Sequence, residues 1–513
     1  MNKIEEIKAA KDGLDVLEDL RRYARERTPV EQMDPGDLER MKWYGVFHRR
    51  LTPGYFMMRL RVTGGKLTAD QADAIANVAD EFGRGTLDLT TRQNIQLRWL
   101  TIDVIPTVIE RLQAAGISTM QTGQDNLRNY VTCPLAGIDA SEVVDTRPIL
   151  VELAKRHLGN REFSNLPRKF NVSVTGCLED CGHAQTQDLG LVPALKRVDG
   201  EHVVGFNVLV GGSLGGTEPK LAEPMDVFVL PQQVPGFVLS VLRVFRDYGP
   251  REVRTKARIR WLIAQWGMER FRAAVEEAFG EPLWREGRHL TTRPGGDHLG
   301  VRPQRVQGMY SVGVHVPVGR MTAKQLRELA WVARRYGSSE LRLTNDQNLL
   351  IVNVPKLHVE PLLEEPVLQE LQPYPSSVDR AFVVCTGNDY CHFSLIDTKN
   401  RAIELALALK ARGVEVPSGT RIHISGCINA CGKHHVGDIG LEGTKVRIGD
   451  RQAEAAHVFV GGKLQLCGGR LAERYRENVL FEELVDVIVE ALPRLHNESS
   501  EGTAAENAQE VKV

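Results

Sequence analysis

The chain has 513 residues, of which 42% are hydrophobic and 26% charged, and its formal net charge is −1 at pH 7. Such a composition is typical of a globular protein with room for about three domains of ordinary size. The near-zero charge argues against a general nucleic-acid binder, and no apolar run approaches the length needed to span a bilayer.

The first 27 residues predict a charged helix. The segment MNKIEEIKAAKDGLDVLEDLRRYARER mixes acids with bases and has no apolar stretch of the kind found in signal peptides. Eight cysteines without a secretion signal indicate reduced thiols or metal ligands, and we therefore expect a cytoplasmic protein.

An internal repeat organises the chain. Residues 65–94, GKLTADQADAIANVADEFGRGTLDLTTRQN, align with 319–348, GRMTAKQLRELAWVARRYGSSELRLTNDQN, at a constant offset of 254. Apolar residues at helical spacing, such as Ile75, Val78, Ala79 and Phe82, predict an amphipathic helix in each copy, followed by two strands and a polar turn.

A second pair of segments repeats at an offset of 250. VTGCLEDCGHAQTQDLGL at 174–191 matches ISGCINACGKHHVGDIGL at 424–441, and FNVLVGG at 206–212 matches VFVGG at 458–462. Chance does not maintain such offsets over several elements. We infer a duplication in which each half contains one α+β unit and one cysteine-loop unit.

Four cysteines in the last third of the chain predict a metal centre. Cys385 and Cys391 form a C-x5-C pair, and Cys427 and Cys431 form a C-x3-C pair. Four thiolates from two loops can ligate a four-iron four-sulfur cluster, because each iron needs one soft anionic ligand. A structural zinc site and unligated thiols are the alternatives, although zinc pairs favour shorter spacings.

A series of motifs runs in order from about residue 38 to about residue 490. They are KWYG, YFMMRLRV, LTTRQNIQ, GQDNLRN, NLPRKFN, VGVHVPVGR, LRLTNDQN, the two cysteine pairs and VFVGG. In this order they resemble the sirohaem-dependent nitrite and sulfite reductases, in particular the ferredoxin-dependent assimilatory nitrite reductases.

The resemblance implies an α+β protein with a pseudo-two-fold, duplicated three-domain nitrite/sulfite reductase fold containing ferredoxin-like half-repeats. The expected order is an N-terminal helical segment (1–50), a first ferredoxin-like half-repeat (51–120), a first cluster-loop-type α/β domain (121–300), a second half-repeat (301–370), a second α/β domain with the cluster cysteines (371–496) and a disordered tail (497–513).

The implied activity is the six-electron reduction of nitrite to ammonia at a sirohaem coupled to a 4Fe-4S cluster. The cluster ligands would be Cys385, Cys391, Cys427 and Cys431, and Cys431 would also bridge to the sirohaem iron. The electron donor must be a separate carrier, because the sequence contains no GxGxxG motif opening a helix, no flavin module and no ferredoxin-like cysteine run. We expect reduced ferredoxin, or flavodoxin, as that donor, and a monomer without nucleic-acid or membrane partners.

The resemblance places the substrate pocket on Arg59, Arg128, Lys169 and Asn171. Arginine offers a planar fork for the nitrite oxygens, lysine can pass a proton as oxygen leaves as water, and asparagine is a neutral hydrogen-bond partner. Taken alone, each residue has an ordinary structural interpretation. The repeat supports Arg59, because the corresponding position in the other half is Gly313.

The turn TTRQN is the predicted sirohaem contact. Arginine binds carboxylates in a bidentate manner, so the resemblance suggests that the turn anchors sirohaem carboxylates. The residues concerned are Thr91, Arg92, Gln93 and Asn94. A purely structural turn is the alternative, and Asn345 and Gln347 of the second copy could act similarly with less charge.

Two further features stay open at this point. The basic run 243–260, RVFRDYGPREVRTKARIR, could line the sirohaem, dock an acidic electron donor or form a solvated helix face. Cys133, Cys177 and Cys181 match three of the four cluster positions, and Asp139 falls on the fourth. We interpret them as buried free thiols left from the duplication, with a second cluster as the alternative. Cys467 matches neither pattern and is expected to be structural.

Two positions favour nitrite over sulfite as the substrate. Sulfite-reducing relatives place a second lysine in K-x-K, where this chain has Lys169-Phe170-Asn171, and some carry a crosslinked cysteine where this chain has Gly123. Sulfite is a dianion, so an amide in place of a cation weakens its binding more. A ferredoxin-dependent sulfite reductase remains the alternative, and a colourless, non-catalytic zinc or RNA-binding protein is the remote one.

Overall fold

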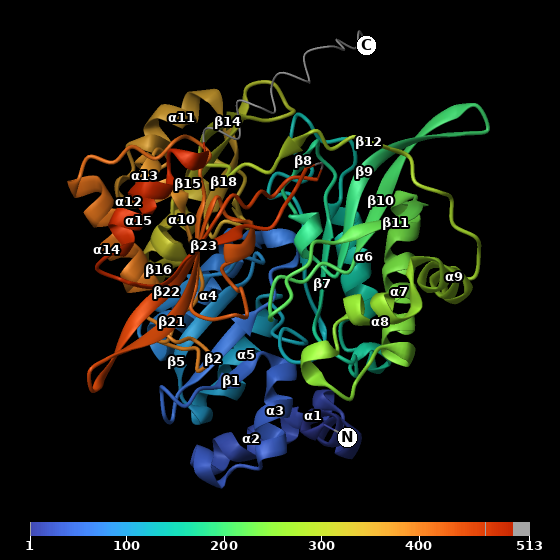
Figure 1. Ribbon diagram of the computed structural model, residues 1–513, viewed down its shortest axis with the longest axis horizontal. Coiled ribbons are helices and arrows are strands. Elements are labelled where there is room, and N and C mark those ends of the chain that lie inside the picture. Colours follow the sequence, from blue (N-terminus) through green and yellow to red (C-terminus); the bar gives the residue numbers. More distant parts are fainter. Residues whose placement is uncertain (1, 467, 496–513) are drawn as a thin grey trace. The chain divides into compact units, whose positions relative to one another are not determined.

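The computed structural model describes residues 2–466 and 468–495 (Figure 1). It divides into two compact units, one with residues up to 214, 220–374 and 465–466, the other with 215–219, 375–464 and 468 onward. Each unit is described by itself below. Cys467 and the predicted tail at 497–513 lie outside the described residues. No described helix is both long and apolar enough to cross a membrane.

Helices and strands are mixed along the whole described chain. The elements are α1 (Lys3–Ala10), α2 (Leu17–Glu26), α3 (Pro35–Arg40), β1 (Val46–His48), β2 (Phe56–Leu60), β3 (Lys66–Thr68), α4 (Ala69–Phe82), β4 (Thr86–Leu89), β5 (Ile95–Leu100), α5 (Ile105–Ala114), β6 (Leu127–Val131), α6 (Arg147–His157), β7 (Phe170–Val174), β8 (Glu179–Asp180), β9 (Leu189–Val198), β10 (Glu201–Val210), β11 (Glu223–Val229), α7 (Val234–Tyr248), α8 (Ile259–Trp266), α9 (Met268–Phe279), β12 (Arg288–His289), β13 (Arg293–Pro294), β14 (Gly300–Pro303), β15 (Met309–Val314), β16 (Arg320–Thr322), α10 (Ala323–Tyr336), β17 (Glu340–Leu343), β18 (Leu349–Pro355), α11 (Lys356–Leu363), α12 (Pro366–Glu370), α13 (Ser377–Ala381), β19 (Phe382–Val384), α14 (Thr398–Ala411), β20 (Ile422–Ser425), β21 (Ile439–Ile448), β22 (Arg451–Val460), β23 (Glu473–Leu480) and α15 (Leu484–Ala491).

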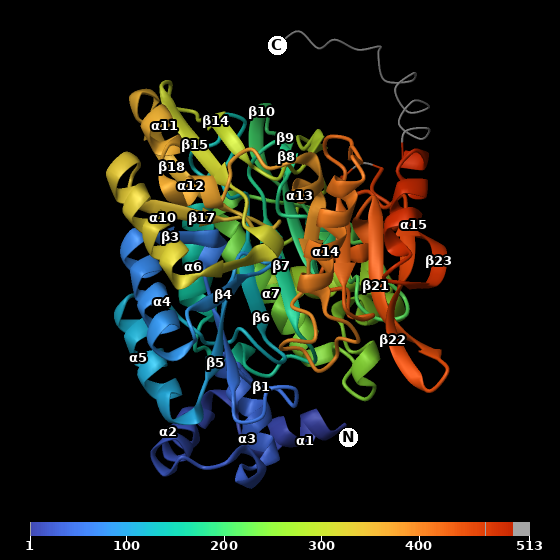
Figure 2. The same cartoon turned by 90° about the vertical axis from the view of Figure 1, so that its left-hand side faces the viewer.

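The predicted half-repeats form two five-stranded sheets in the first unit. Their strand orders are β1-β2-β5-β4-β16 and β14-β15-β18-β17-β3. The predicted amphipathic helix is α4 in the first copy and α10 in the second, and the two pack side by side (Figure 2). Each begins at a threonine that closes a capping box with a glutamine three residues later, Thr68 with Gln71 and Thr322 with Gln325, so both copies start their helix in the same way.

The two copies exchange a strand. Strand β16 of the second copy pairs with β4 of the first, and β3 of the first pairs with β17 of the second. The registers Arg320 with Asp88 and Lys66 with Arg342 are equivalent under the offset of 254. One apolar core spans both sheets, so the half-repeats form one folding unit related by a pseudo-two-fold axis.

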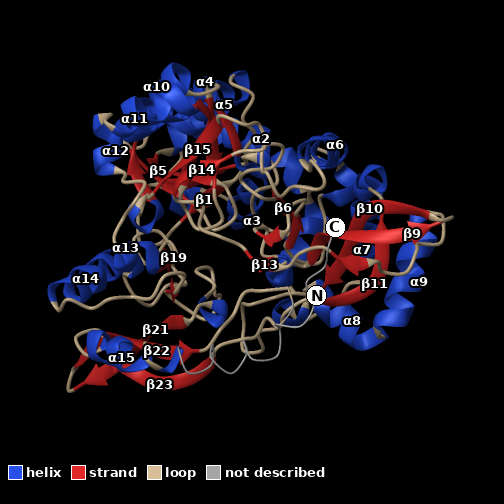
Figure 3. Cartoon of the chain, turned by 90° about the horizontal axis from the view of Figure 1, so that it is seen from above, coloured by secondary structure: helices blue, strands red, loops and turns tan. Residues whose placement is uncertain are grey.

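The two cysteine-loop regions are built on sheets with the same strand order. The first is β6-β7-β9-β10-β11 and the second is β19-β20-β21-β22-β23, each with three parallel strands followed by two antiparallel ones. Figure 3 shows helices α7 to α9 beside the first sheet, and α14 and α15 beside the second. The duplication predicted from the sequence is therefore confirmed.

The two large apolar cores of the described part of the first unit lie in the half-repeats and around β6–β11. The second unit contains the remaining sheet. The residue boundaries predicted between the domains stay a prediction, because one compact unit contains both half-repeats and the first α/β region.

Candidate active site

The four predicted cluster cysteines lie on two loops that leave neighbouring parallel strands of the second unit. Cys385 follows β19 directly, and Cys427 lies two residues after β20. Because parallel strands end at the same edge of a sheet, the two loops meet there. Cys431 is exposed, whereas the other three cysteines are half-buried.

The four thiols influence one another's pKa, but their sulfur atoms lie too far apart to surround a single metal ion. Burial raises the pKa of Cys385 to about 12 and that of Cys427 to about 11, and in both cases Cys431 and Cys391 raise it further. In the described chain no three of these sulfur atoms lie within 4.8 Å of one another. A tetrahedral zinc ion with bonds of about 2.3 Å holds its sulfur atoms about 3.8 Å apart. The spacing therefore fits a larger inorganic core.

Glycines shape the cradle between these loops. The main-chain N–H of Gly426 donates to the Cys385 sulfur at 3.2 Å. A side chain at Gly426 would place its Cβ 1.7 Å from the Ser394 hydroxyl, and one at Gly432 would place it 2.0 Å from the Ile424 carbonyl oxygen. The donor to sulfur and the soft ligand set are those that an iron–sulfur cluster requires, so the residues fit the predicted cofactor.

In the first unit, Arg59 and Arg128 converge. Arg59 lies on β2 and Arg128 on β6, and one Nη1 of each donates to the Thr122 carbonyl oxygen, at 2.9 Å and 2.6 Å. Arg128 also donates to the Gln124 carbonyl at 2.7 Å, while its buried Nε has no partner among the described residues. The shared hydrogen-bond acceptor, the Thr122 carbonyl oxygen, thus holds the two guanidinium groups close to each other.

The surroundings of Arg128 are strongly positive. Burial holds the pKa of Arg128 well below its usual value, and the charges of Arg59, Arg92 and Arg168 lower it further. Among the named contributors only Asp125 opposes this shift. Like charges crowded into a buried region repel one another unless an anion joins them. The prediction that this region binds an anion is consistent with that charge.

Lys169 and Asn171 border β7, beside β6. Lys169 is half-buried and immediately precedes the strand. Asn171 is 4% exposed, and its Oδ1 has no hydrogen-bond partner in the described chain. A buried polar atom without a partner is costly, which indicates that a ligand or water completes it.

Asp188 fixes the main chain at this position. The Asn171 N–H donates to Asp188 Oδ2 at 2.8 Å, and Arg258 holds both oxygens of the same carboxylate at 2.7–2.8 Å. At the equivalent positions, the Arg421 N–H donates to Asp438 at 2.8 Å. Sequence reasoning missed Asp188 as a positioning residue, although its match to Asp438 within the repeat was visible.

The basic run 243–260 is divided between the end of α7, a loop and the start of α8, and its arginines form ion pairs. Arg254 holds the buried Asp125 through both oxygens, and Arg258 does the same for Asp188. Arg243 and Arg246 contact Glu162. These arginines therefore neutralise acids of the first unit.

The TTRQN turn and its counterpart TNDQN at 344–348 hold main chain through equivalent side chains. Gln93 donates through Nε2 to the Leu343 carbonyl at 3.0 Å, and Gln347 donates to the Leu89 carbonyl at 3.0 Å, a reciprocal pair across the repeat. Asn94 accepts from the Val62 N–H at 3.1 Å. The side-chain amides of Gln93 and Asn94 thus form hydrogen bonds with main-chain groups. Thr91 is buried, and Arg92 is half-buried and close enough for its charge to lower the pKa of Arg128.

The structure lets the role of Gln93 be tested. Gln93→Leu removes hydrogen bonds to the Leu343 carbonyl and to both main-chain groups of Thr132. Because those groups are buried, we expect the free energy of unfolding to fall by about 2–4 kcal/mol. A circular-dichroism melt measures this, with Gln113→Leu on the exposed face of α5 as the control. Loss of sirohaem at unchanged stability would instead identify Gln93 as a cofactor contact.

Two family models cover most of the chain. The nitrite and sulphite reductase 4Fe-4S domain matches residues 123–283 and 377–508, and the nitrite/sulfite reductase ferredoxin-like half domain matches 48–115 and 302–368. The alternation of the two models reproduces the duplication found in the structure. The chain belongs to the nitrite and sulphite reductase family and has its duplicated α+β fold.

Individual relatives agree with this assignment over nearly their whole length. The chain is 43% identical to a ferredoxin–nitrite reductase of Synechococcus elongatus over 499 residues, 96% of each protein. It is 39% identical to an assimilatory ferredoxin-dependent nitrite reductase of Haloferax mediterranei, covering 90% of this chain and 83% of that one. The solved NirA protein of Mycobacterium tuberculosis superposes with a TM-score of 0.88 at 32% identity, covering 95% of this chain and 92% of that one.

Proposed function

We propose that this protein catalyses the six-electron reduction of nitrite to ammonia with electrons from reduced ferredoxin. The observation that carries the proposal is the convergence of Arg59, Arg92 and Arg168 on the buried Arg128, with Asp125 as the opposing acid. A site of this charge attracts a small anion. The names of the full-length relatives supply the reaction and the donor.

The substrate residues have separate tasks. Arg59 and Arg128 bind the oxygen atoms of nitrite and hold the anion against the repulsion of other negative groups. Lys169 donates protons as the oxygens leave as water. The Oδ1 of Asn171, which has no hydrogen-bond partner among the described residues, accepts a hydrogen bond from a protonated nitrogen or from a water. Arg258, acting through Asp188, is a positioning residue for Asn171.

Two cofactors are needed for this reaction, sirohaem and a 4Fe-4S cluster. Bound together they supply single electrons, which no protein side chain provides. We propose Cys385, Cys391, Cys427 and Cys431 as the cluster ligands, with the exposed Cys431 shared with the sirohaem iron. Arg92, with Thr91 beside it, would hold the sirohaem carboxylates, while Gln93 and Asn94 fix the turn that carries Thr91 and Arg92.

Gly123 bears on the choice between nitrite and sulfite. A Cβ at this position would lie 2.2 Å from the Lys42 carbonyl oxygen and 2.7 Å from the Phe47 ring. A crosslinked cysteine therefore has no room at position 123. Together with Asn171 in place of a second lysine, this favours nitrite as the substrate. We further propose a cytoplasmic monomer without a nucleic-acid partner.

The function is tested by product analysis. Purified enzyme supplied with nitrite and photoreduced ferredoxin should form ammonium with six electrons consumed per nitrite, and its kcat/KM for nitrite should exceed that for sulfite. A visible spectrum identifies the cofactors in the same sample. A colourless protein, or sulfide formation at the higher kcat/KM, contradicts the proposal.

The electron donor gives a second prediction. Reduced ferredoxin should support turnover and NADPH alone should not, because the chain contains no dinucleotide-binding motif. If docking to an acidic carrier is electrostatic, the rate at subsaturating ferredoxin should fall about 10-fold or more as salt is raised. Reduced methyl viologen, a small cation, serves as the control and should lack this fall. Turnover with NADPH would refute the assignment.

A further inference from the structure

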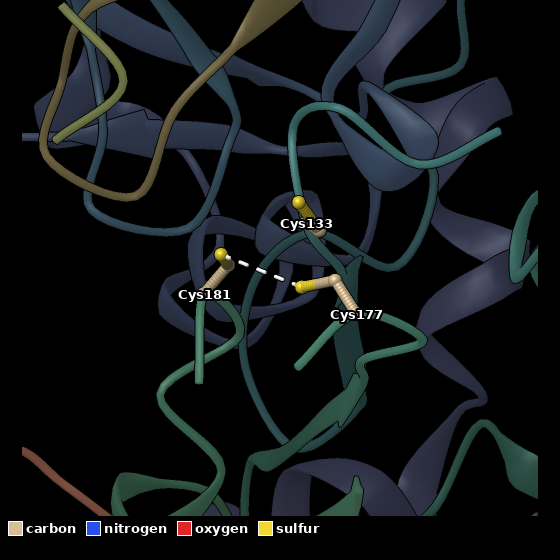
Figure 4. A group of neighbouring side chains, drawn as sticks. All are labelled: Cys133, Cys177 and Cys181. Carbon is tan, nitrogen blue, oxygen red and sulfur yellow. Dashed lines mark hydrogen bonds between the residues drawn. The ribbon is translucent and has the colours of Figure 1, made fainter. Parts of the chain in front are cut away.

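Three buried cysteines of the first unit meet at one place (Figure 4). The sulfur atoms of Cys133, Cys177 and Cys181 all lie within 4.8 Å of one another, and those of Cys177 and Cys181 are 3.7 Å apart. Each of the three residues is at most 2% exposed. They come from the loops after β6 and β7 and from the end of β8, so the fold itself brings them together.

A histidine from a distant segment lies beside Cys181, in a second group that contains Glu179 but neither Cys133 nor Cys177. His298 Nε2 lies 3.4 Å from the Cys181 sulfur, and the residue is 3% exposed. Its φ of 62° is uncommon for a residue with a side chain. Gly313 permits this placement, because a Cβ there would lie 1.9 Å from the His298 carbonyl oxygen. The absence of an arginine at the position equivalent to Arg59 thus has a structural reason.

We propose that Cys133, Cys177, Cys181 and His298 bind one zinc ion in a structural site separate from the cluster. Zinc with bonds of about 2.3 Å to sulfur and about 2.0–2.1 Å to nitrogen sets sulfur–sulfur and sulfur–nitrogen separations of about 3.8 Å and 3.5 Å. The observed 3.7 Å and 3.4 Å agree with both. On binding, the three thiols release their protons to solvent and no electron is transferred.

The spacing distinguishes one ion from a second cluster. All three sulfur atoms lie within 4.8 Å, whereas no three of the four predicted cluster cysteines do so in the described chain. The duplication has therefore left two sites of different size. Soft thiolates in a closed, buried setting select zinc over the harder divalent ions.

Glu179 competes for the fourth position, because its Oε2 lies 3.8 Å from the Cys181 sulfur and groups with Cys181 and His298. Asp139 is the second competing ligand, because it falls on the missing cysteine position. Its Oδ2 lies 3.8 Å from the Cys133 sulfur, while its Oδ1 accepts from the N–H and hydroxyl of Ser141. Three thiolates and a carboxylate would leave two negative charges beside Leu135 and Leu350, where charge is poorly solvated. Neutral imidazole leaves one. We therefore assign the fourth position to His298.

The site would tie down a long connection. Residues 280–299 join α9 to β14, the first strand of the second half-repeat, and contain only the two-residue strands β12 and β13 as described regular structure. Connections of this length are uncommon in compact proteins unless something anchors them. His298 lies at the end of this segment, so zinc would fasten it to the loops of the first α/β region.

Metal analysis of the intact enzyme, purified without chelators, is the direct test. We expect about one zinc per chain in addition to the iron, with three sulfur neighbours at about 2.3 Å and one nitrogen at about 2.0–2.1 Å in zinc-edge X-ray absorption. An enzyme without zinc whose three thiols react after denaturation would overturn the proposal. So would iron and acid-labile sulfide that fall in Cys177→Ser, because they would indicate a second cluster.

Variants assign the ligands. Cys177→Ser and His298→Gln should lose zinc while retaining sirohaem absorption and sulfide, and trypsin should cleave faster after Arg285 or Arg288. Leu135→Ala is the matched control, because Leu135 packs in the same apolar group but offers no ligand atom. It should retain zinc despite lower stability. Full zinc in His298→Gln, or equal loss in Leu135→Ala, would contradict the assignment.

Discussion

Replacement of Cys431 by serine should abolish nitrite reduction, leaving activity at the background of the assay. Cys431 is the exposed member of the four predicted cluster ligands, and its charge acts on both Cys385 and Cys427. A serine hydroxyl is a harder and much less acidic ligand than a thiol, so it does not replace a thiolate on iron. Iron, acid-labile sulfide and the visible spectrum report the loss of the cluster and of its coupling to sirohaem.

Cys181→Ser is the matched control for this experiment. The two positions are equivalent under the offset of 250, and each is the second cysteine of a C-x3-C pair. Cys181 belongs to the three-cysteine group of the first unit, so its replacement should leave sulfide content and the sirohaem spectrum in place. If both variants lose sulfide to the same extent, the cluster has been assigned to the wrong half of the duplication.

Much of the fold could be predicted because of the duplication. A pattern seen in one copy of the repeat can be checked at the equivalent residues of the other copy. The alignment of 65–94 with 319–348 identified α4 and α10 and the strand pairs that follow. The exchange of β3 and β16 between sheets could not be predicted. A three-residue strand has too little pattern to reveal its partner, and pairing within its own copy satisfies the same hydrogen bonds.

The residues of the candidate site also fall into some that the sequence could predict and others that it could not. The resemblance predicted Arg59 and Arg128 as pocket residues, and the spacing of the four cysteines predicted a metal centre. The structure brings the two arginines to one carbonyl oxygen. The sequence of the basic run 243–260 could not show which of its arginines are exposed and which pair with buried acids. Arg254 and Arg258 are bound to buried acids, which depends on distant residues. Likewise, His298 lies outside every motif, so its approach to Cys181 required the fold.

Substrate choice can be tested at a single residue, Asn171. Asn171→Lys adds a positive charge to the proposed pocket of Arg59, Arg128 and Lys169, and a dianion gains more from that charge than a monoanion does. In a partly water-excluded site the differential should be about 1–2 kcal/mol, a factor of roughly 5–30. We expect the ratio of kcat/KM for sulfite to that for nitrite to rise by this factor near pH 8, where sulfite is mostly dianionic.

Two controls separate charge from size in this variant. Asn171 is 4% exposed, so a longer side chain strains the packing whatever its charge, and burial favours the neutral form of a lysine. Asn171→Met has the length of lysine without the charge and should slow both reactions at a constant ratio, while Arg128→Ala should disable both. If the lysine variant leaves the ratio flat while Arg128→Ala disables both reactions, the pocket is correctly placed. Charge at position 171 would then not be what selects the anion.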